Sequence, residues 1–286
     1  MGKLPVNRLS RSLRRISAYE VGRLACLSSG RPYIFYLSFR SEALRKVGVL
    51  ERIAKTFAER GIPVLQLKVS TPLKEGELRA IIIADLAGHE NLALRLVGEL
   101  EKIPTVMRVS FEPPIVNGLA VDSSSFPLQL VGERAIIMRK VVYDSLIRGG
   151  WRRLGSGYGQ LLYLIGFEIG KSAYRSHLNI ARRDPSLVVD VMARIFQLVG
   201  YGIVDVVELD DSGFRAVVRV YDSFECELFR GVGEIRGNLV RGMLAGWLAE
   251  RWGGLSFEQV TAREVKCIAR GDPHCEYHIT GRKRGS

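Results

Sequence analysis

Two periodicities of apolar residues divide the first part of the chain into strands and helices. Residues 32–39 form an almost unbroken apolar run, which indicates a strand, and residues 41–60 carry apolar side chains three and four positions apart, which predicts a helix. Gly61 follows at a position where helices commonly end. The other predicted elements are strands at 62–70 and 78–86, a helix at 89–102 and a strand at 105–112. This βαββαβ order predicts a ferredoxin-like sandwich, with two helices on one face of an antiparallel sheet.

The second half of the chain has longer helical patterns, and a segment rich in proline and serine precedes it. Residues 112–126 hold two adjacent prolines and three successive serines, so we expect a domain boundary there. Helices are predicted at 155–176, 185–198 and 239–252. Two strands joined by the turn sequence Asp-Asp-Ser-Gly lie between the second and third of these helices. The chain is therefore predicted to be an α+β protein with two domains.

Two cysteines in the last part of the chain carry the strongest signal for chemistry. Strand-like runs at 263–269 and 275–280 flank the turn-forming sequence Arg-Gly-Asp-Pro-His, which predicts a β-hairpin. Cys267 and Cys275 are equally far from the centre of this turn, so their sulfur atoms are expected on one face. Together with Glu264 they offer three ligands to a metal ion, whereas a zinc site needs four. A metal site and a structural pair, either buried thiols or a disulfide, both remain open.

The same region resembles the 4-vinyl reductase domain family, and the resemblance covers about residues 126–281. It rests on the sequences EVKCIARGDPHCEYHI, GMLAGWLAERWGG and VYDSFECELF. Members of this family are small-molecule-binding domains of bacteriochlorophyll biosynthesis proteins, phenol-sensing transcription activators and many archaeal proteins. The resemblance implies a domain that encloses a small apolar or aromatic ligand.

The resemblance also implies a zinc site. In the phenol sensors of the family, a glutamate, two cysteines at this spacing and one earlier cysteine bind a structural zinc ion. Glu264, Cys267 and Cys275 match three of these ligands. The earlier cysteine is expected a few residues before Gly242, and this chain has none there. Cys226 precedes that position on what we predict to be a strand, so it would need a different geometry.

Glycines in two predicted helices indicate a close approach by another group. Gly166 and Gly170 lie four residues apart, and each costs about 1 kcal/mol of helix stability relative to alanine. Gly242 and Gly246 repeat this spacing in the helix at 239–252. Either the two helices touch, or a ligand lies between them. For a ligand cavity, the predicted lining residues are Tyr158, Leu162, Ile165, Phe196 and Trp247.

The sequence FRSEALRKVGVLERIAKTFAERGIPVLQLKV resembles the start of an ACT domain, a regulatory fold that often binds amino acids at a dimer interface. Gly48-Val49-Leu50 matches the Gly-Val-Leu of that family, and Gly61-Ile62 matches its Gly-Ile at the helix end. The resemblance implies a dimerisation module, with or without an amino-acid ligand, and therefore a homodimer.

The formal net charge of +12 resides at the two ends of the chain. Residues 1–60 hold 13 Lys and Arg against 4 Asp and Glu, and the last five residues add three cations. The basic residues of the first 16 positions are Lys3, Arg8, Arg11, Arg14 and Arg15. They could bind nucleic acid through phosphate contacts, or they could form a solvated arm, because no helix-turn-helix or zinc-finger pattern accompanies them.

Several sequence motifs of common enzymes are absent from the chain. It has no P-loop, no glycine-rich dinucleotide motif, no His-Glu-x-x-His and no Gly-x-Ser-x-Gly. No long apolar run predicts a membrane span or a signal peptide, so we expect a cytoplasmic protein. We predict a sensor or regulatory protein rather than an enzyme. The alternatives are an enzyme or accessory protein acting on a tetrapyrrole-like or hydrophobic substrate, and an accessory protein that binds nucleic acid through residues 1–16.

The expected organisation has five segments. They are a basic arm at 1–30, an ACT-like domain at 31–113, a linker at 114–125, a 4-vinyl reductase-type domain at 126–281 and a basic tail at 282–286.

Overall fold

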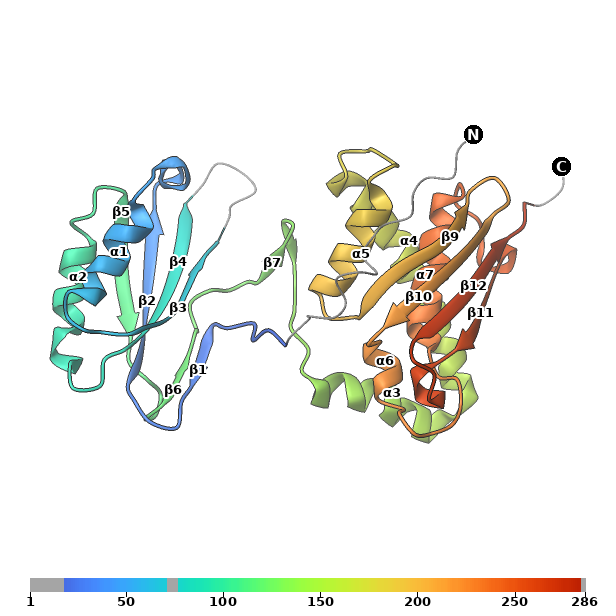
Figure 1. Cartoon of the computed structure of the whole chain (residues 1–286), viewed down its shortest axis with the longest axis horizontal. Coiled ribbons are helices and arrows are strands. Elements are labelled where there is room, and N and C mark those ends of the chain that lie inside the picture. Colours follow the sequence, from blue (N-terminus) through green and yellow to red (C-terminus); the bar gives the residue numbers. More distant parts are fainter. Residues whose placement is uncertain (1–17, 71–76, 284–286) are drawn as a thin grey trace. The chain divides into compact units, whose positions relative to one another are not determined.

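The computed structural model describes residues 18–70 and 77–283, which form two compact units (Figure 1). The first unit comprises residues 17–136, and the second contains residues 137–286. Both units combine helices with antiparallel sheets, so the predicted α+β class is confirmed. The basic residues predicted to contact nucleic acid, all within 1–16, lie outside the described residues.

The first unit is built on a four-stranded antiparallel sheet with the strand order β3-β4-β2-β5. Its strands are β1 Leu24–Cys26, β2 Pro32–Phe39, β3 Val64–Val69, β4 Leu78–Asp85, β5 Val106–Glu112, β6 Leu119–Val121, β7 Gln129–Leu130 and β8 Glu133–Arg134. Its helices are α1 Val49–Ala58 and α2 Ala93–Leu100, with short 3-10 helices η3 Ser41–Arg45 and η4 Glu90–Leu92. The elements β2 to β5 follow one another in the predicted βαββαβ order.

Alternation along β2 divides the first unit into two apolar layers. Phe35 packs with Phe57 of α1 on the helix-covered face of the sheet. Ile34 points to the other face, where it packs with Ala25 of β1 and Ala120 of β6. The pairing of β1 with β6 therefore brings part of the predicted arm and part of the predicted linker into this unit.

The helix predicted at 41–60 is interrupted in the structure. Gly48 has a φ of 87°, a left-handed conformation that glycine adopts without steric cost. The chain therefore forms η3 before Gly48 and α1 after it.

The second unit places helices against a sheet of strand order β11-β12-β10-β9, in which all neighbours are antiparallel (Figure 1). Its helices are α3 Lys140–Leu154, α4 Ser156–Ile180, α5 Val188–Leu198, α6 Phe224–Glu227 and α7 Asn238–Arg251, with 3-10 helices η5 Phe257–Gln259 and η6 Ile268–Arg270. Its strands are β9 Ile203–Asp210, β10 Arg215–Tyr221, β11 Val260–Lys266 and β12 Cys275–Gly281. Within 18–70 and 77–283, no helix is both long and apolar enough to cross a bilayer.

Helices α4 and α7 touch along a line of glycines, which we name the glycine seam. Its members are Gly166, Gly170, Gly242 and Gly246. A Cβ atom at Gly166 would overlap the carbonyl oxygen of Leu239, and one at Gly246 would overlap the carbonyl oxygen of Phe167. Of the two explanations that the spacing left open, helix contact is therefore the one observed at the seam.

Candidate functional site

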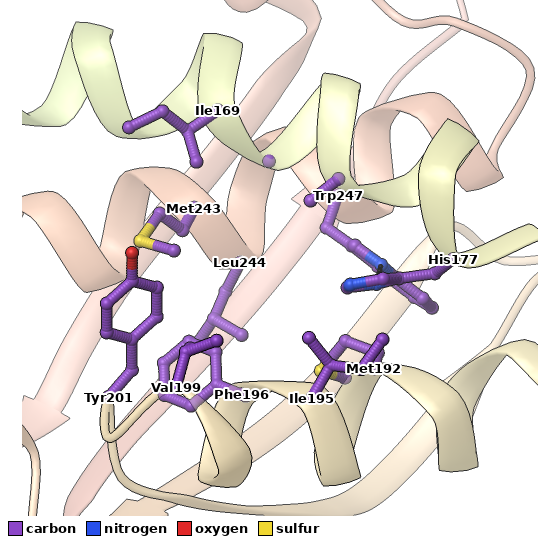
Figure 2. A pocket seen from close by; sticks show the side chains of 12 residues that line it. Ile169, His177, Met192, Ile195, Phe196, Val199, Tyr201, Met243, Leu244 and Trp247 are labelled. Carbon is purple, nitrogen blue, oxygen red and sulfur yellow. Dashed lines mark hydrogen bonds between the residues drawn. The ribbon is translucent and has the colours of Figure 1, made fainter. Parts of the chain in front are cut away.

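A cavity of about 220 Å³ lies between α4, α5 and α7 in the second unit (Figure 2). It lies beside the glycine seam, and Gly170 belongs to both. The lining residues are Ile169, Gly170, Ala173, His177, Met192, Ile195, Phe196, Val199, Tyr201, Met243, Leu244 and Trp247. The wall is therefore apolar apart from three side chains, and none of the twelve residues is an acid, a lysine or an arginine.

His177 is a buried hydrogen-bonding group at one side of this cavity. The indole Nε1 of Trp247 donates to Nδ1 of His177 across 3.1 Å. Burial lowers the pKa of His177 to about 4, so the ring is neutral at pH 7. With Nδ1 acting as the acceptor, the ring proton resides on Nε2. Among the described residues, the hydrogen bond of this ring is the one at Nδ1, so Nε2 remains available to donate to a bound molecule.

Tyr201 supplies a second polar group on the opposite side of the cavity from His177 (Figure 2). Its ring stacks on Phe224 at a centroid distance of 5.0 Å and meets the edge of Phe196 at 5.3 Å. These contacts fix the ring, and Figure 2 shows its hydroxyl directed toward Met243. The cavity thus has an apolar middle and a hydrogen-bonding group at either side.

Two of the five predicted lining residues, Phe196 and Trp247, line the cavity, and the other three lie elsewhere. The Tyr158 ring packs over Gly150 of α3, and its hydroxyl donates to the carbonyl of Leu146. Leu162 belongs to the general core, and Ile165 is 42% exposed.

The misplaced residues share one physical cause. The amino-terminal half of α4 packs on α3 and along the seam, so the cavity begins only at Ile169. From α5, sequence reasoning named Phe196 but missed Met192 and Ile195, because the apolar stripe of this helix is indistinguishable from ordinary core. No sequence signal showed the hydrogen bond between Trp247 and His177, which lie 70 residues apart in the chain.

A second site is a buried cluster of three thiols and one carboxyl group from α6 and the hairpin of β11 and β12. It consists of Cys226, Glu264, Cys267 and Cys275, whose ligand atoms all lie within 4.8 Å of one another. The predicted hairpin is confirmed, since β11 pairs with β12 and Gly271 turns the chain with a φ of 103°. The three predicted ligands therefore lie together, and their cysteines are free thiols.

Cys226 is the fourth group of this cluster, and the prediction that it lies on a strand is wrong. The chain around it forms the short helix α6 instead of continuing the strand β10. The Asp-Ser pair before Phe224 is a helix-start signal that could have indicated this turn. The helix carries the sulfur of Cys226 to 3.8 Å from Oε1 of Glu264.

Electrostatics of the cluster favour a cation at its centre. The interactions of Cys267 with the neighbouring thiols of Cys226 and Cys275 lower its pKa to about 2. Burial, together with the nearby Cys267 charge, raises the pKa of Glu264 to about 9. The cluster therefore favours one negative charge, on Cys267, and the raised pKa of Glu264 keeps that carboxyl group protonated. A divalent metal ion would replace the protons of these groups and offset part of their negative charge.

The donor set and its dimensions fit zinc. Three sulfur atoms and one carboxylate are common zinc ligands, and a tetrahedron with Zn–S bonds of about 2.3 Å has edges of about 3.8 Å. The observed span of 4.8 Å accommodates such a tetrahedron with small adjustments.

Gly237 lies close to where the family resemblance led us to expect a cysteine. Its backbone N–H donates to Oε2 of Glu264 across 3.0 Å. A Cβ atom there would come within 2.6 Å of both Oε2 of Glu264 and the hydroxyl oxygen of Tyr277. The space for a side chain at this position is therefore taken, and Cys226 reaches the cluster from the opposite end of the intervening loop.

Comparisons with known proteins give distant similarities, and no family model matches the chain. An uncharacterised protein of Methanocaldococcus jannaschii is 24% identical over 133 residues, which is 46% of this chain and 70% of that protein. The phenol-responsive sensory domain of the transcription activator PoxR with phenol is 16% identical, with a TM-score of 0.46 over 54% of this chain and 79% of that one. A vinyl-4-reductase family protein from Methanocaldococcus jannaschii is 17% identical, with a TM-score of 0.34 over 52% of this chain and 85% of that one.

Proposed function

We propose that the second unit is a sensor domain that binds a compact, neutral and largely apolar molecule in the cavity between α4, α5 and α7. The observation that carries this proposal is an apolar cavity that is lined by His177, whose Nε2 is free to donate a hydrogen bond. Apolar walls with a few convergent polar groups are the usual form of a small-molecule site.

The chemistry of the wall defines the ligand class. A charged ligand would lose its hydration without meeting an opposite charge, because no lysine, arginine, aspartate or glutamate lines the cavity. A neutral molecule with one hydrogen-bond acceptor can satisfy His177 and bury the rest of its surface. The volume of about 220 Å³ is below the 300–1,000 Å³ of typical pockets for drug-sized ligands, which favours a single ring or a short chain.

Thermal melting with a matched ligand panel tests this proposal. Phenol and cyclohexanol should raise the melting temperature, toluene should raise it less, and benzoate should have no effect. A ligand at 100 times its Kd stabilises the folded state by about 2.7 kcal/mol. The preference for phenol over toluene should disappear in His177→Phe. Equal shifts from phenol and benzoate, or no shift from any neutral compound, would contradict the proposal.

We further propose that Cys226, Glu264, Cys267 and Cys275 hold a structural zinc ion. The supporting observation is that four potential ligands are buried and that their ligand atoms lie within 4.8 Å of one another. Such a site would connect α6 to the hairpin of β11 and β12. Elemental analysis should give one zinc per chain in the wild type and a loss of retained zinc in Cys226→Ser. Full zinc retention by Cys226→Ser would remove Cys226 from the proposed ligand set.

For the first unit we propose an ACT-like, ferredoxin-like dimerisation module. Its strand order supports the arrangement, and the edge strand β3 leaves Val64, Leu65 and Leu67 each about 40% exposed. Exposed apolar edges promote association between chains, and a lysine on such an edge opposes it. Native mass spectrometry should therefore show a dimer for the wild type and a monomer for Leu67→Lys. A monomeric wild type would exclude this role.

A further inference from the structure

The short helix α6 supplies one residue to the Cys226 cluster and contacts Tyr201 and helix α7, which both contribute to the cavity wall, through three consecutive residues. Cys226 belongs to the cluster. Phe224 stacks on Tyr201, which lines the cavity. Glu225, between them, reaches the amino terminus of α7, whose later residues form another wall of the cavity. Because α6 has only four residues, it has little freedom to bend between these contacts.

Glu225 holds the first turn of α7 with both of its carboxylate oxygens. Oε1 accepts from the backbone N–H groups of Asn238 and Leu239 at 3.0 and 2.9 Å, and Oε2 accepts from that of Val240 at 2.9 Å. These amides have no partner within their own helix, and a negative charge there is favoured by the helix dipole. Glu225 is fully buried, so water cannot replace it. The position of α7 is therefore tied to the position of Glu225.

Helix α7 continues from this turn to the cavity. Met243, Leu244 and Trp247 line it, and Trp247 donates to His177. A shift of the first turn of α7 would move these side chains, since the backbone hydrogen bonds of a helix keep neighbouring turns in register. Contiguous contacts thus lead from the sulfur of Cys226 to the hydrogen-bonding group of the cavity.

We propose that Glu225 is a positioning residue that couples metal binding at the Cys226 cluster to ligand binding in the cavity. This inference rests on the proposed function of both sites and adds that each ligand increases the affinity for the other. Metal binding fixes Cys226, and Glu225 passes this restraint to α7. The coupling is reciprocal, because two ligands that favour one conformation must favour each other.

Amide hydrogen exchange with and without zinc tests the coupling without depending on a cavity ligand. In the wild type, zinc should slow exchange at least tenfold in two segments, 238–240 and 243–247. In Glu225→Gln, zinc should still bind at one ion per chain, but exchange in 243–247 should change less than twofold. The matched control is Glu227→Gln, which alters an exposed carboxylate of the same helix that pairs with Lys140. This control should respond like the wild type.

Phenol affinity supplies a second measurement. Zinc should tighten phenol binding about fivefold or more in the wild type and in Glu227→Gln, a typical size for coupling between sites, and should leave it unchanged in Glu225→Gln. Exchange that zinc does not alter in wild-type 243–247, or a full zinc response in Glu225→Gln, would overturn the inference.

Two further outcomes separate this inference from the proposed function. If phenol does not bind but zinc slows exchange in 243–247, the ligand proposal fails and the link between cluster and α7 stands. If the wild type binds no zinc, the metal site and the coupling both fail. If Glu225→Gln does not fold, the zinc-dependent exchange of the wild type tests the inference alone. Slower exchange in 238–240 without slower exchange in 243–247 would overturn it.

Discussion

The glycine seam and the cavity are made by the same two helices, yet one region is closed and the other is hollow. At Gly166 and Gly246 the backbones of α4 and α7 are so close that no Cβ atom fits between them. The cavity lies beside this seam: Ala173 and His177 of α4 and Met243, Leu244 and Trp247 of α7 line it, and α5 completes the enclosure. The comparison teaches that glycines at helical spacing mark contact, whereas the cavity forms where larger side chains of the same two helices face α5.

The largest expected effect comes from adding one methyl group to the seam. Gly246→Ala places a Cβ atom on the carbonyl oxygen of Phe167, where backbone lies on both sides and cannot move aside cheaply. Overpacking commonly costs about 1–3 kcal/mol, and the rigid surroundings place this variant at or above the upper end. Urea denaturation measures the loss. If Gly246→Ala has the same unfolding free energy as the wild type, the helices are not in contact at this position.

The next effect concerns the hollow region and depends on pH. Burial holds the pKa of His177 at about 4, below the ordinary 6.5, so the unfolded chain takes up this proton first as the pH falls. Stability from the neutral ring is complete above about pH 6.5 and is lost progressively toward pH 4. A shift of this size amounts to about 3 kcal/mol at most.

The measurement is the unfolding free energy of wild type and His177→Phe at a series of pH values from 7 to 4. Subtracting the unfolding free energy of His177→Phe from that of the wild type cancels the contributions of the carboxylates, because both proteins contain them. This difference should shrink across the window as the wild type loses its advantage. A difference independent of pH would mean that His177 is not buried in a neutral form.

A smaller effect on stability, with a large effect on binding, is expected from filling the cavity. Ala173→Leu adds three carbon atoms beside His177 without touching the seam. Its unfolding free energy should stay within about 1 kcal/mol of the wild type, since space is available. Phenol should bind at least tenfold more weakly, as measured by titration calorimetry. Unchanged binding would place the ligand site elsewhere.

The smallest effect is expected at a glycine of α4 outside both regions. A Cβ atom at Gly157 would meet no atom within 4 Å. Gly157→Ala should therefore stabilise the protein by up to about 1 kcal/mol, because alanine favours the helical state. The variant also serves as the control for Gly246→Ala in the same denaturation experiment. Equal losses from both substitutions would mean that seam contact does not explain the cost.

Features determined by neighbouring residues were predictable from the sequence. The hairpin that carries Cys267 and Cys275 follows from turn residues and strand patterns within one short stretch. The order of helices and strands in the first unit follows in the same way. The break at Gly48 was not predicted, since an isolated glycine is compatible with a continuous helical pattern.

Features determined by distant contacts were not predictable. Cys226 reaches Glu264 across 38 residues, and nothing near it in the sequence marks a ligand. The pairing of β1 with β6 joins segments almost a hundred residues apart, and both strands are only three residues long. In the cavity, Phe196 and Trp247 were named on apolar character, which equally suited Leu162 of the core.

The position of β12 has a consequence for the order in which the second unit can assemble during synthesis. This strand follows β9, β10 and β11 in the chain, but it lies between β10 and β11. A ribosome-bound chain that has not yet exposed Cys275 therefore has no bridge between its β9–β10 hairpin and β11, and its other cluster thiols have no common partner. The sheet and the cluster are therefore completed together, once β12 has been synthesised.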